Sequence, residues 1–259
     1  MNSTTPAHSD PDQHSTSLHT KGSDIGESQN NAVSRNNAQL QNNAVRGLIV
    51  MDIDATVIDE EVIDQLAMVA GVEDQVAPIT AQAMRGELDF EQALRHRVSL
   101  LRGLPSSVFA QVYRTLHPTH GVRELIETAH QHGFKVGVVS GGFHEVADML
   151  VRDLHIDYCL AHRLEIANGV LTGNVEGDIV TKTRKQQMLS TWAQECGLSM
   201  DRTVAIGDGA NDIPMILSAG VGIAFCAKPK TRASAPFAID TRDLMLAWPI
   251  IAQKLHITN

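Results

Sequence analysis

The sequence predicts an α/β fold: a Rossmann-like, mostly parallel sheet with helices on both faces and a small helical cap inserted after the first strand. Helical patterns alternate with short apolar runs, an order typical of parallel sheets covered on both sides. Four helical patterns in succession follow the first run and predict the insertion. The runs read as buried parallel strands and lie at 48–51, 136–139, 203–207 and 221–225.

The helical patterns have recognisable ends. Gly71 can terminate the first helix of the insert, Asp89 is a candidate N-cap for the third, and Pro118 follows the fourth. Asn168-Gly169 lies between two strand-like stretches over 164–172 and predicts a tight hairpin turn. The expected helices are 61–70, 74–85, 89–101, 106–116, 122–132, 144–154, 182–196 and 242–255.

Three regions are expected along the chain. Residues 1–45 are rich in Ser, Thr, Asn, Gln and His with hardly any large apolar side chain, which predicts a disordered tail. Residues 46–59 and 118–259 form the predicted α/β core. Residues 60–117 form the predicted helical cap.

Composition excludes several classes of partner. A net charge of −9 over 259 residues argues against nucleic acid or an anionic membrane as the main partner. No stretch approaches the roughly 20 apolar residues of a membrane span. The three cysteines, Cys159, Cys196 and Cys226, have neither metal-ligand nor redox spacing, which suits reduced thiols in a cytoplasmic protein. The sequence does not indicate an oligomeric state.

Polar side chains follow three of the predicted strands. Asp52 and Asp54 come after the first, Ser140-Gly141-Gly142 after the second, and Asp208 with Asn211 and Asp212 after the third. Ligands of such sheets bind outside the carboxyl ends of the strands, so these groups are expected to converge. Carboxylates with room for water favour Mg²⁺, and Ser140 with the glycine amides suits phosphate oxygens.

The first motif alone would also fit a strand followed by an acidic turn, because Asp is common in turns. The convergence of three polar strand ends favours the site. A phosphate site also needs a cation, and Lys182 and Lys185, at the start of the next helix, are the two candidates.

These motifs resemble those of the haloacid dehalogenase-like phosphohydrolases. The matching strings are Asp-x-Asp-x-Thr at 52–56, Ser-Gly-Gly at 140–142, a later lysine, and Gly-Asp-Gly-x-Asn-Asp at 207–212. More narrowly, the chain is similar to the phosphoserine phosphatase family, through strings at 61–64, 84–90, 97–98, 139–143, 173–177 and 227–229. Beyond the tail, the similarity covers the whole chain.

The resemblance implies hydrolysis of L-phosphoserine, the last step of serine biosynthesis, through an aspartyl-phosphate. Asp52 would be the nucleophile and Asp54 the general acid and base. Mg²⁺ would be held by the side chains of Asp52 and Asp208 and the carbonyl of Asp54, with Asp212 and Thr56 orienting the ligands. Phosphate would be bound by Ser140, Gly141, Gly142 and Lys185, with Asn211 nearby; Lys185 is preferred over Lys182 because Lys185-Gln-Gln-Met-Leu matches the family spacing.

Substrate choice is expected to lie in the cap. Phosphoserine carries an ammonium and a carboxylate, so its pocket needs both signs of charge. The resemblance assigns the ammonium to Glu61 and the carboxylate to Arg97, with Phe90 lining the closed pocket. Without the resemblance, Glu61 and Arg97 would read as exposed helix charges and Phe90 as core.

Other functions stay open. One is another capped small-molecule phosphatase, or a phosphotransferase with homoserine as acceptor. A second, from another class, is a non-catalytic Mg²⁺- and phosphate-binding signalling module. A response-regulator receiver does not fit, because receivers keep the phosphorylated Asp on a later strand than the acidic pair and have no cap.

Overall fold

A computed structural model of the chain describes residues 44–84 and 87–257. The predicted tail at 1–45 therefore lies almost entirely outside the described residues, and so does the predicted end of the second insert helix at Arg85 and Gly86. Within the described residues, no helix is both long enough and apolar enough to cross a membrane.

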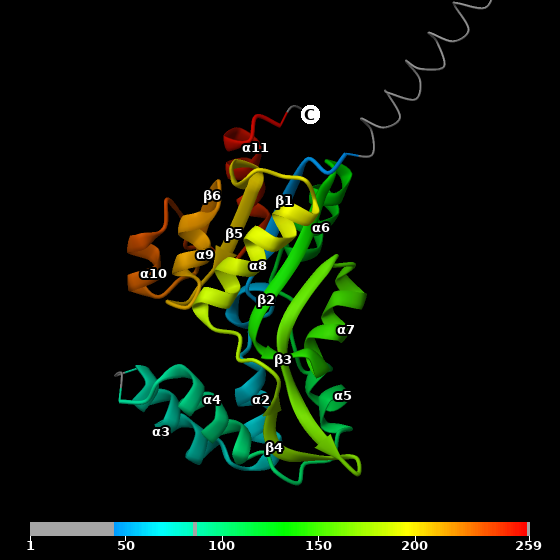
Figure 1. The fold of residues 1–259 in the computed structure, drawn as a ribbon, viewed down its shortest axis with the longest axis vertical. Coiled ribbons are helices and arrows are strands. Elements are labelled where there is room, and N and C mark those ends of the chain that lie inside the picture. Colours follow the sequence, from blue (N-terminus) through cyan, green and yellow to red (C-terminus); the bar gives the residue numbers. More distant parts are fainter. Residues whose placement is uncertain (1–43, 85–86, 258–259) are drawn as a thin grey trace, which may run out of the picture. The chain divides into compact units, whose positions relative to one another are not determined.

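Seven strands form one sheet in the order β4-β3-β2-β1-β5-β6-β7 (Figure 1). All neighbouring pairs are parallel except β3 and β4, which are antiparallel, so the predicted α/β class is confirmed. The strands are β1 (Gly47–Met51), β2 (Phe134–Phe143), β3 (Tyr158–Ala167), β4 (Val170–Glu176), β5 (Thr203–Gly207), β6 (Val221–Phe225) and β7 (Phe237–Ile239).

Alternation along β1 distributes its side chains between two cores. Leu48 and Val50 pack with the helices on one face of the sheet, whereas Ile49 and Met51 pack with those on the other. Because both faces are covered, every residue of β1, β5 and β6 is buried. The first face carries α8 (Lys182–Glu195) and α9 (Ile213–Ser218); the second carries α6 (Val122–Gln131), α7 (His144–Leu154) and α11 (Ala247–Lys254).

The predicted insert is helical and comprises α2 (Val62–Ala70), α3 (Glu73–Met84), α4 (Phe90–Ser99) and α5 (Val108–Tyr113). Gly71 ends α2 in the left-handed conformation at φ 66°, and Asp89 begins α4 with a capping box to Gln92. Both helix-end predictions are confirmed.

The β3–β4 hairpin extends from the sheet to the insert (Figure 1). Asn168 and Gly169 form its turn with φ of 51° and 79°, as Asn-Gly predicts. Beyond the turn, Leu171 exchanges backbone hydrogen bonds of 2.8 Å with Gly103 and Leu104, in the loop after α4. The hairpin therefore packs against the insert.

Several predicted boundaries are wrong. Ser140-Gly141-Gly142 lies within β2 rather than after it, because an irregularity in register allows Phe143 to pair with β3. The last helix is shorter than predicted, because the Asp243 carboxylate accepts from Met245 N and a 3₁₀ turn, η3 (Leu244–Leu246), precedes α11. The fourth insert helix ends at Tyr113. The sequence patterns also missed the first half of β3, as well as β7, α10 (Pro229–Ser234) and the 3₁₀ turn η2 (Met200–Arg202).

Two antiparallel linkers join the insert to the sheet. The amide of Asp59 in the first linker donates to His117 O in the second at 3.0 Å, and Thr119 N donates to Val57 O at 2.9 Å. An isolated antiparallel bridge pairs Ile58 with Pro118. The two linkers therefore act as a short two-stranded connection.

Arg242 holds both linkers from one side. Its guanidinium donates to the Asp59 carboxylate at 2.5 Å, to the carbonyls of Ala55 and Ile58 at 3.2 and 3.1 Å, and to Thr119 Oγ1 at 3.3 Å. Charged donors to carbonyls are among the stronger hydrogen bonds. Arg242 therefore ties the start of the insert to the C-terminal part of the chain.

We expect Arg242→Ala to lower the free energy of unfolding by about 1–3 kcal/mol, since it leaves several partly buried acceptors without a donor. Arg232→Ala is the matched control, because Arg232 makes a two-pronged but exposed pair with Asp240. Exposed pairs contribute about 0–1 kcal/mol. Urea unfolding of both variants provides the measurement. Equal losses in the free energy of unfolding would contradict the proposed role of Arg242 in holding the two linkers.

Candidate active site

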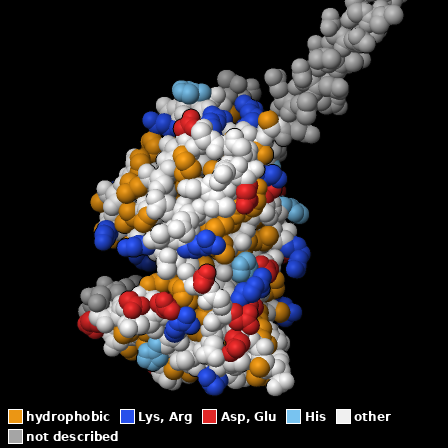
Figure 2. All heavy atoms as spheres, viewed as in Figure 1, with side chains coloured by type: hydrophobic (Ala, Val, Ile, Leu, Met, Phe, Trp, Pro, Cys, Tyr) orange, Lys and Arg blue, Asp and Glu red, His pale blue; other side chains and the backbone are white. Residues whose placement is uncertain are grey.

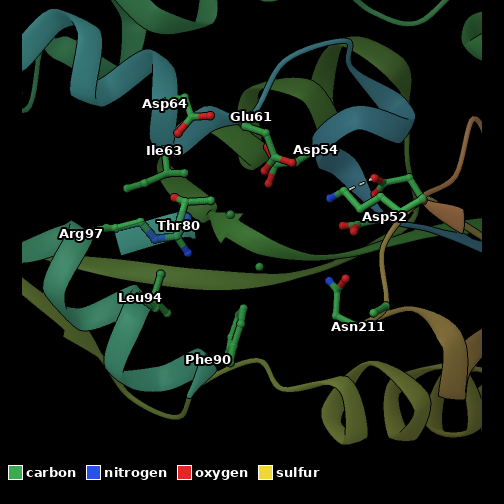
Figure 3. Close-up of a pocket in the computed structure, with 15 residues that line it drawn as sticks. Asp52, Asp54, Glu61, Ile63, Asp64, Thr80, Phe90, Leu94, Arg97 and Asn211 are labelled. Carbon is green, nitrogen blue, oxygen red and sulfur yellow. Dashed lines mark ion pairs between the residues drawn. The ribbon is translucent and has the colours of Figure 1, made fainter. Parts of the chain in front are cut away.

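The carboxyl ends of β1, β2 and β5 open into a pocket of about 540 Å³ that the insert covers. On the face in Figure 2, a notch separates α3 and α4 from the part of the molecule that carries α8 to α10. Figure 3 shows the side chains that project into the pocket. Its lining consists of Asp52, Asp54, Glu61, Ile63, Asp64, Thr80, Phe90, Leu94, Arg97, Gly141, Gly142, Asp208, Ala210, Asn211 and Lys228.

Asp52 and Asp54 reach the pocket through a wide turn, η1 (Ile53–Val57), rather than along an extended strand. Asp52 Oδ1 accepts from Ile53 N at 2.8 Å, and Asp54 Oδ1 accepts from the first amide of α2, Val62 N, at 3.0 Å. The turn requires Ala55 to adopt φ 53°, a conformation that costs a non-glycine residue about 1 kcal/mol. Both carboxylates therefore face the same pocket, as predicted, and the turn directs them there.

Lys185 lies beneath these carboxylates. Thr181 caps α8, and one turn later the Lys185 Nζ lies 2.7 Å from Asp52 Oδ2 and 2.8 Å from Asp212 Oδ1. Its side chain is 1% exposed, whereas Lys182 is exposed. Burial alone would lower the pKa of Lys185, but Asp212 and Asp52 raise it, so the ammonium stays charged.

The carboxylates at the strand ends outnumber the nearby cations. Oxygens of Asp52, Asp208 and Asp212 lie within 4.8 Å of one another, and burial is the main cause that raises the pKa of Asp52 and Asp208. Burial likewise raises the pKa of the neighbouring Asp54. Among the described residues, the ammonium groups that pair with this cluster are those of Lys185 and Lys228.

Four carboxylates against two ammonium groups leave an excess of negative charge that a divalent cation would balance. Oxygen ligands of this kind suit a hard ion such as Mg²⁺. Both oxygens of Asp212 are already engaged, Oδ1 by Lys185 and Oδ2 by Gly209 N at 3.0 Å. Asp52 is engaged in the same way, Oδ1 by Ile53 N and Oδ2 by Lys185, so these contacts do not separate Asp52 from Asp212 as a ligand. Asp208 is paired only with Lys228, at 3.5 Å, among the described residues.

The phosphate-binding candidates of β2 contact Asp54 directly. Ser140 Oγ donates to Asp54 Oδ2 at 3.2 Å and accepts from Gly142 N at 2.8 Å. A Cβ on Gly142 would lie 2.8 Å from Asp54 Oδ2, so any larger residue here would displace the Asp54 carboxylate. Gly141 and Asn211 line the pocket beside them.

Charges of both signs lie on the insert side of the pocket (Figure 3). Burial first, and Asp54 second, raise the pKa of Glu61 to about 7. Arg97 lies on α4, where its Nε donates to Ala93 O at 3.3 Å, and burial lowers its pKa. Phe90, at the start of α4, stands beside Gly141, where an added Cβ would lie 3.5 Å from its ring.

One predicted residue, Thr56, makes no side-chain hydrogen bond to the other candidates in the described part of the chain. Its hydroxyl is fully buried in η1 and has no hydrogen-bond partner among the described residues. Conversely, sequence reasoning missed Lys228, whose Nζ lies 3.5 Å from Asp208 Oδ2 at the pocket edge. The Ala-Lys-Pro string at 227–229 was the available signal.

A second cluster is formed by His144, Asp148 and Cys159. Ala161 N donates to His144 Nε2 at 3.1 Å, so the ring proton lies on Nδ1, 2.8 Å from Asp148 Oδ1. Burial raises the pKa of the Cys159 thiol to about 12. With both ring nitrogens engaged and the thiol protonated, this cluster is a hydrogen-bonded packing arrangement.

Comparison with known proteins agrees with this geometry. The family model of the haloacid dehalogenase-like hydrolases matches residues 49–217. The phosphoserine phosphatase of Streptococcus thermophilus is 56% identical over 200 residues, which cover 77% of this chain and 93% of that protein. The phosphoserine phosphatase of Methanocaldococcus jannaschii is 44% identical over 197 residues, covering 76% and 93%.

Solved structures show the same similarity. A phosphoserine phosphatase solved as a phospho-aspartyl intermediate analogue aligns with a TM-score of 0.75 at 42% identity, covering 79% of this chain and 98% of that one. A substrate-bound phosphoserine phosphatase complex aligns with the same TM-score, identity and coverage. The resemblance inferred from the motifs is therefore confirmed: the chain belongs to the haloacid dehalogenase-like hydrolases and, within them, to the phosphoserine phosphatase family.

Proposed function

We propose that this chain hydrolyses L-phosphoserine to L-serine and phosphate, with Mg²⁺ held by the side chains of Asp52 and Asp208 and the carbonyl of Asp54. One observation carries the proposal. A single pocket joins a buried carboxylate and lysine cluster at the strand ends to Glu61 and Arg97 on the insert. Phosphoserine has the complementary groups, a phosphate at one end and a zwitterion at the other.

The proposed chemistry has two steps. Asp52 attacks phosphorus and forms an aspartyl-phosphate, while Asp54 gives its proton to the departing seryl oxygen. Asp54 then takes a proton from the water that attacks phosphorus, and Asp52 is released with inorganic phosphate. Burial raises the pKa of Asp54, which supports an acid that can hold this proton, although the hydrogen bonds from Val62 N and Ser140 Oγ act in the opposite direction.

Charge neutralisation is the other requirement, because a phosphate monoester repels an anionic nucleophile. Lys185 Nζ, 2.7 Å from Asp52 Oδ2, is placed to contact the phosphate oxygens as well. Gly141, Gly142 and Asn211 line the pocket, and Ser140 Oγ contacts the Asp54 carboxylate at its edge. When bound, Mg²⁺ would supply further positive charge at the phosphoryl group.

The proposed partner is a small molecule, the phosphate ester of an amino acid. Neither nucleic acid nor a membrane is proposed as a main partner. Glu61 would bind the ammonium, Arg97 the carboxylate, and Phe90 would cover the serine carbons. The three cysteines are free thiols, in keeping with the cytoplasmic setting expected from the sequence.

A phosphotransferase that passes the phosphoryl group to homoserine would use the same first step. It differs in the acceptor of the second step, so the two activities are separated by their products. A non-catalytic phosphate-binding module would release no phosphate from phosphoserine. The geometry favours hydrolysis over that module, because Asp54 stands beside the proposed nucleophile.

We expect phosphate release from L-phosphoserine with Mg²⁺ present, loss of release after chelation, and a fall of at least about 10³-fold in Asp52→Asn. The amide removes the nucleophile but keeps the size of the side chain. Asp240→Asn, at an exposed Asp paired with Arg232, is the matched control. Retained turnover in a folded Asp52→Asn protein would exclude the covalent mechanism.

Arg97→Ala is expected to raise KM for phosphoserine by about 10- to 100-fold, the range for loss of a charged hydrogen-bonded pair. The same change should leave KM for phosphoethanolamine, which lacks the carboxylate, nearly unaltered. Arg95→Ala is the matched control, because Arg95 is an exposed residue of the same helix paired with Glu91. Equal effects on both substrates would remove Arg97 from the recognition of the carboxylate.

Glu61 should make stability depend on pH. Its pKa in the folded protein is about 7, against an ordinary value of 4.5. Below the ordinary value the group is protonated in both states and has no effect. Between the two values the unfolded chain loses its proton first, so stability falls as pH rises, and above about 7 the full cost is present.

In metal-free buffer we therefore expect Glu61→Gln to be more stable than the parent at pH 8, by on the order of 1–3 kcal/mol. The difference should shrink towards pH 4.5, the ordinary value of a glutamate. Urea unfolding at several pH values measures it. A difference that is constant across this range would show that Glu61 is not destabilised as a buried carboxylate.

A further inference from the structure

His162 lies behind the phosphate-binding end of β2 and takes no part in the chemistry described so far. It belongs to β3 and is 1% exposed. Its Nδ1 lies 3.0 Å from Gly141 O and 3.3 Å from Gly142 O, while its Nε2 accepts from Val180 N at 2.8 Å. Since Nε2 accepts and both Nδ1 partners are carbonyls, the ring is neutral with its proton on Nδ1.

These contacts place three parts of the site on one ring. Gly141 and Gly142 belong to the proposed phosphate-binding strand end. Val180 directly precedes Thr181, the cap of the helix that carries Lys185. The ring of Phe90, from the insert, lies 6.4 Å from the imidazole centroid on the pocket side.

A hydrogen-bonded chain leads from the imidazole to Asp54. In a trans peptide the C=O and the following N–H point in opposite directions. Holding Gly141 O towards His162 therefore directs Gly142 N the other way, where it donates to Ser140 Oγ at 2.8 Å. Ser140 Oγ then donates to Asp54 Oδ2 at 3.2 Å.

We propose that His162 is a positioning residue that orients the Gly141–Gly142 peptide, and through it Ser140 and Asp54, for phosphoryl transfer. The proposal rests on the phosphatase activity proposed above. Burial lowers the pKa of His162, which agrees with a neutral ring. Protonation of Nε2 would make it a donor that faces the donor Val180 N, and the hydrogen bond between them would be lost.

Two substitutions separate hydrogen bonding from packing. His162→Phe keeps an aromatic ring but has neither donor nor acceptor, whereas His162→Asn keeps one of each. We expect kcat to fall about tenfold or more in His162→Phe, with KM for phosphoserine changing less than about threefold, because Glu61 and Arg97 are untouched. His162→Asn should recover most of the lost kcat.

His144→Phe is the matched control. His144 also accepts a backbone N–H, from Ala161 next to His162, but it contacts neither Gly141 nor Gly142. Its kcat should stay within about twofold of the parent. Equal losses in His162→Phe and His144→Phe, or no recovery in folded His162→Asn, would overturn the proposal.

A second readout does not depend on activity. Nitrogen NMR of the uniformly ¹⁵N-labelled parent, assigned by loss of the signal in His162→Asn, should show a neutral ring protonated on Nδ1 at pH 7. A cationic ring, or a proton on Nε2, would overturn the proposal. If the parent releases no phosphate from phosphoserine, the proposed function fails, and the NMR result still tests the hydrogen bonds that the His162 ring makes.

Discussion

The contact between Lys185 and the carboxylates of Asp52 and Asp212 is the interaction on which the site depends. Three carboxylates from β1 and the segment after β5 meet at the sheet edge, and Asp212 is fully buried. Charges so confined repel one another unless a cation lies among them. Lys185 supplies one from the first turn of α8, at 2.7 and 2.8 Å.

Lys185 does not neutralise all of the carboxylates, and the negative charge that remains can attract a further cation. Lys228 offsets part of it from the pocket edge, and a divalent cation would offset the rest. A phosphate ester that enters meets fixed groups rather than water, so little reorganisation is needed as charge moves to its oxygens. Burial is the main cause of the raised pKa values of Asp52, Asp54 and Asp208, and repulsion between the carboxylates adds to it.

The connection between the sheet and the insert lies next to this charged cluster. The turn η1 carries Asp54, and it leads directly into the linkers that Arg242 holds. Asp54 also accepts from the first amide of α2, so movement of the insert and orientation of the carboxylate are coupled through one short segment. Closure of a covering element around a substrate commonly completes a catalytic site in this way. His162 joins the opposite side of the pocket in a comparable manner, through β2 and the loop before α8.

Local sequence patterns were sufficient to predict much of the secondary structure of the protein. Apolar runs placed β1, β5 and β6, Gly71 and Asp89 marked helix ends, and Asn168-Gly169 marked the hairpin turn, because each depends on near neighbours. The site motifs could be predicted for a different reason, because the carboxyl ends of parallel strands meet at one edge of the sheet. Tertiary structure alone decided that Ser140 to Phe143 continues β2, that Arg242 leaves the last helix to hold the linkers, and that His162 stands behind Gly141. Each of these depends on partners distant in sequence, whose hydrogen bonds override local preference and leave no periodic signal.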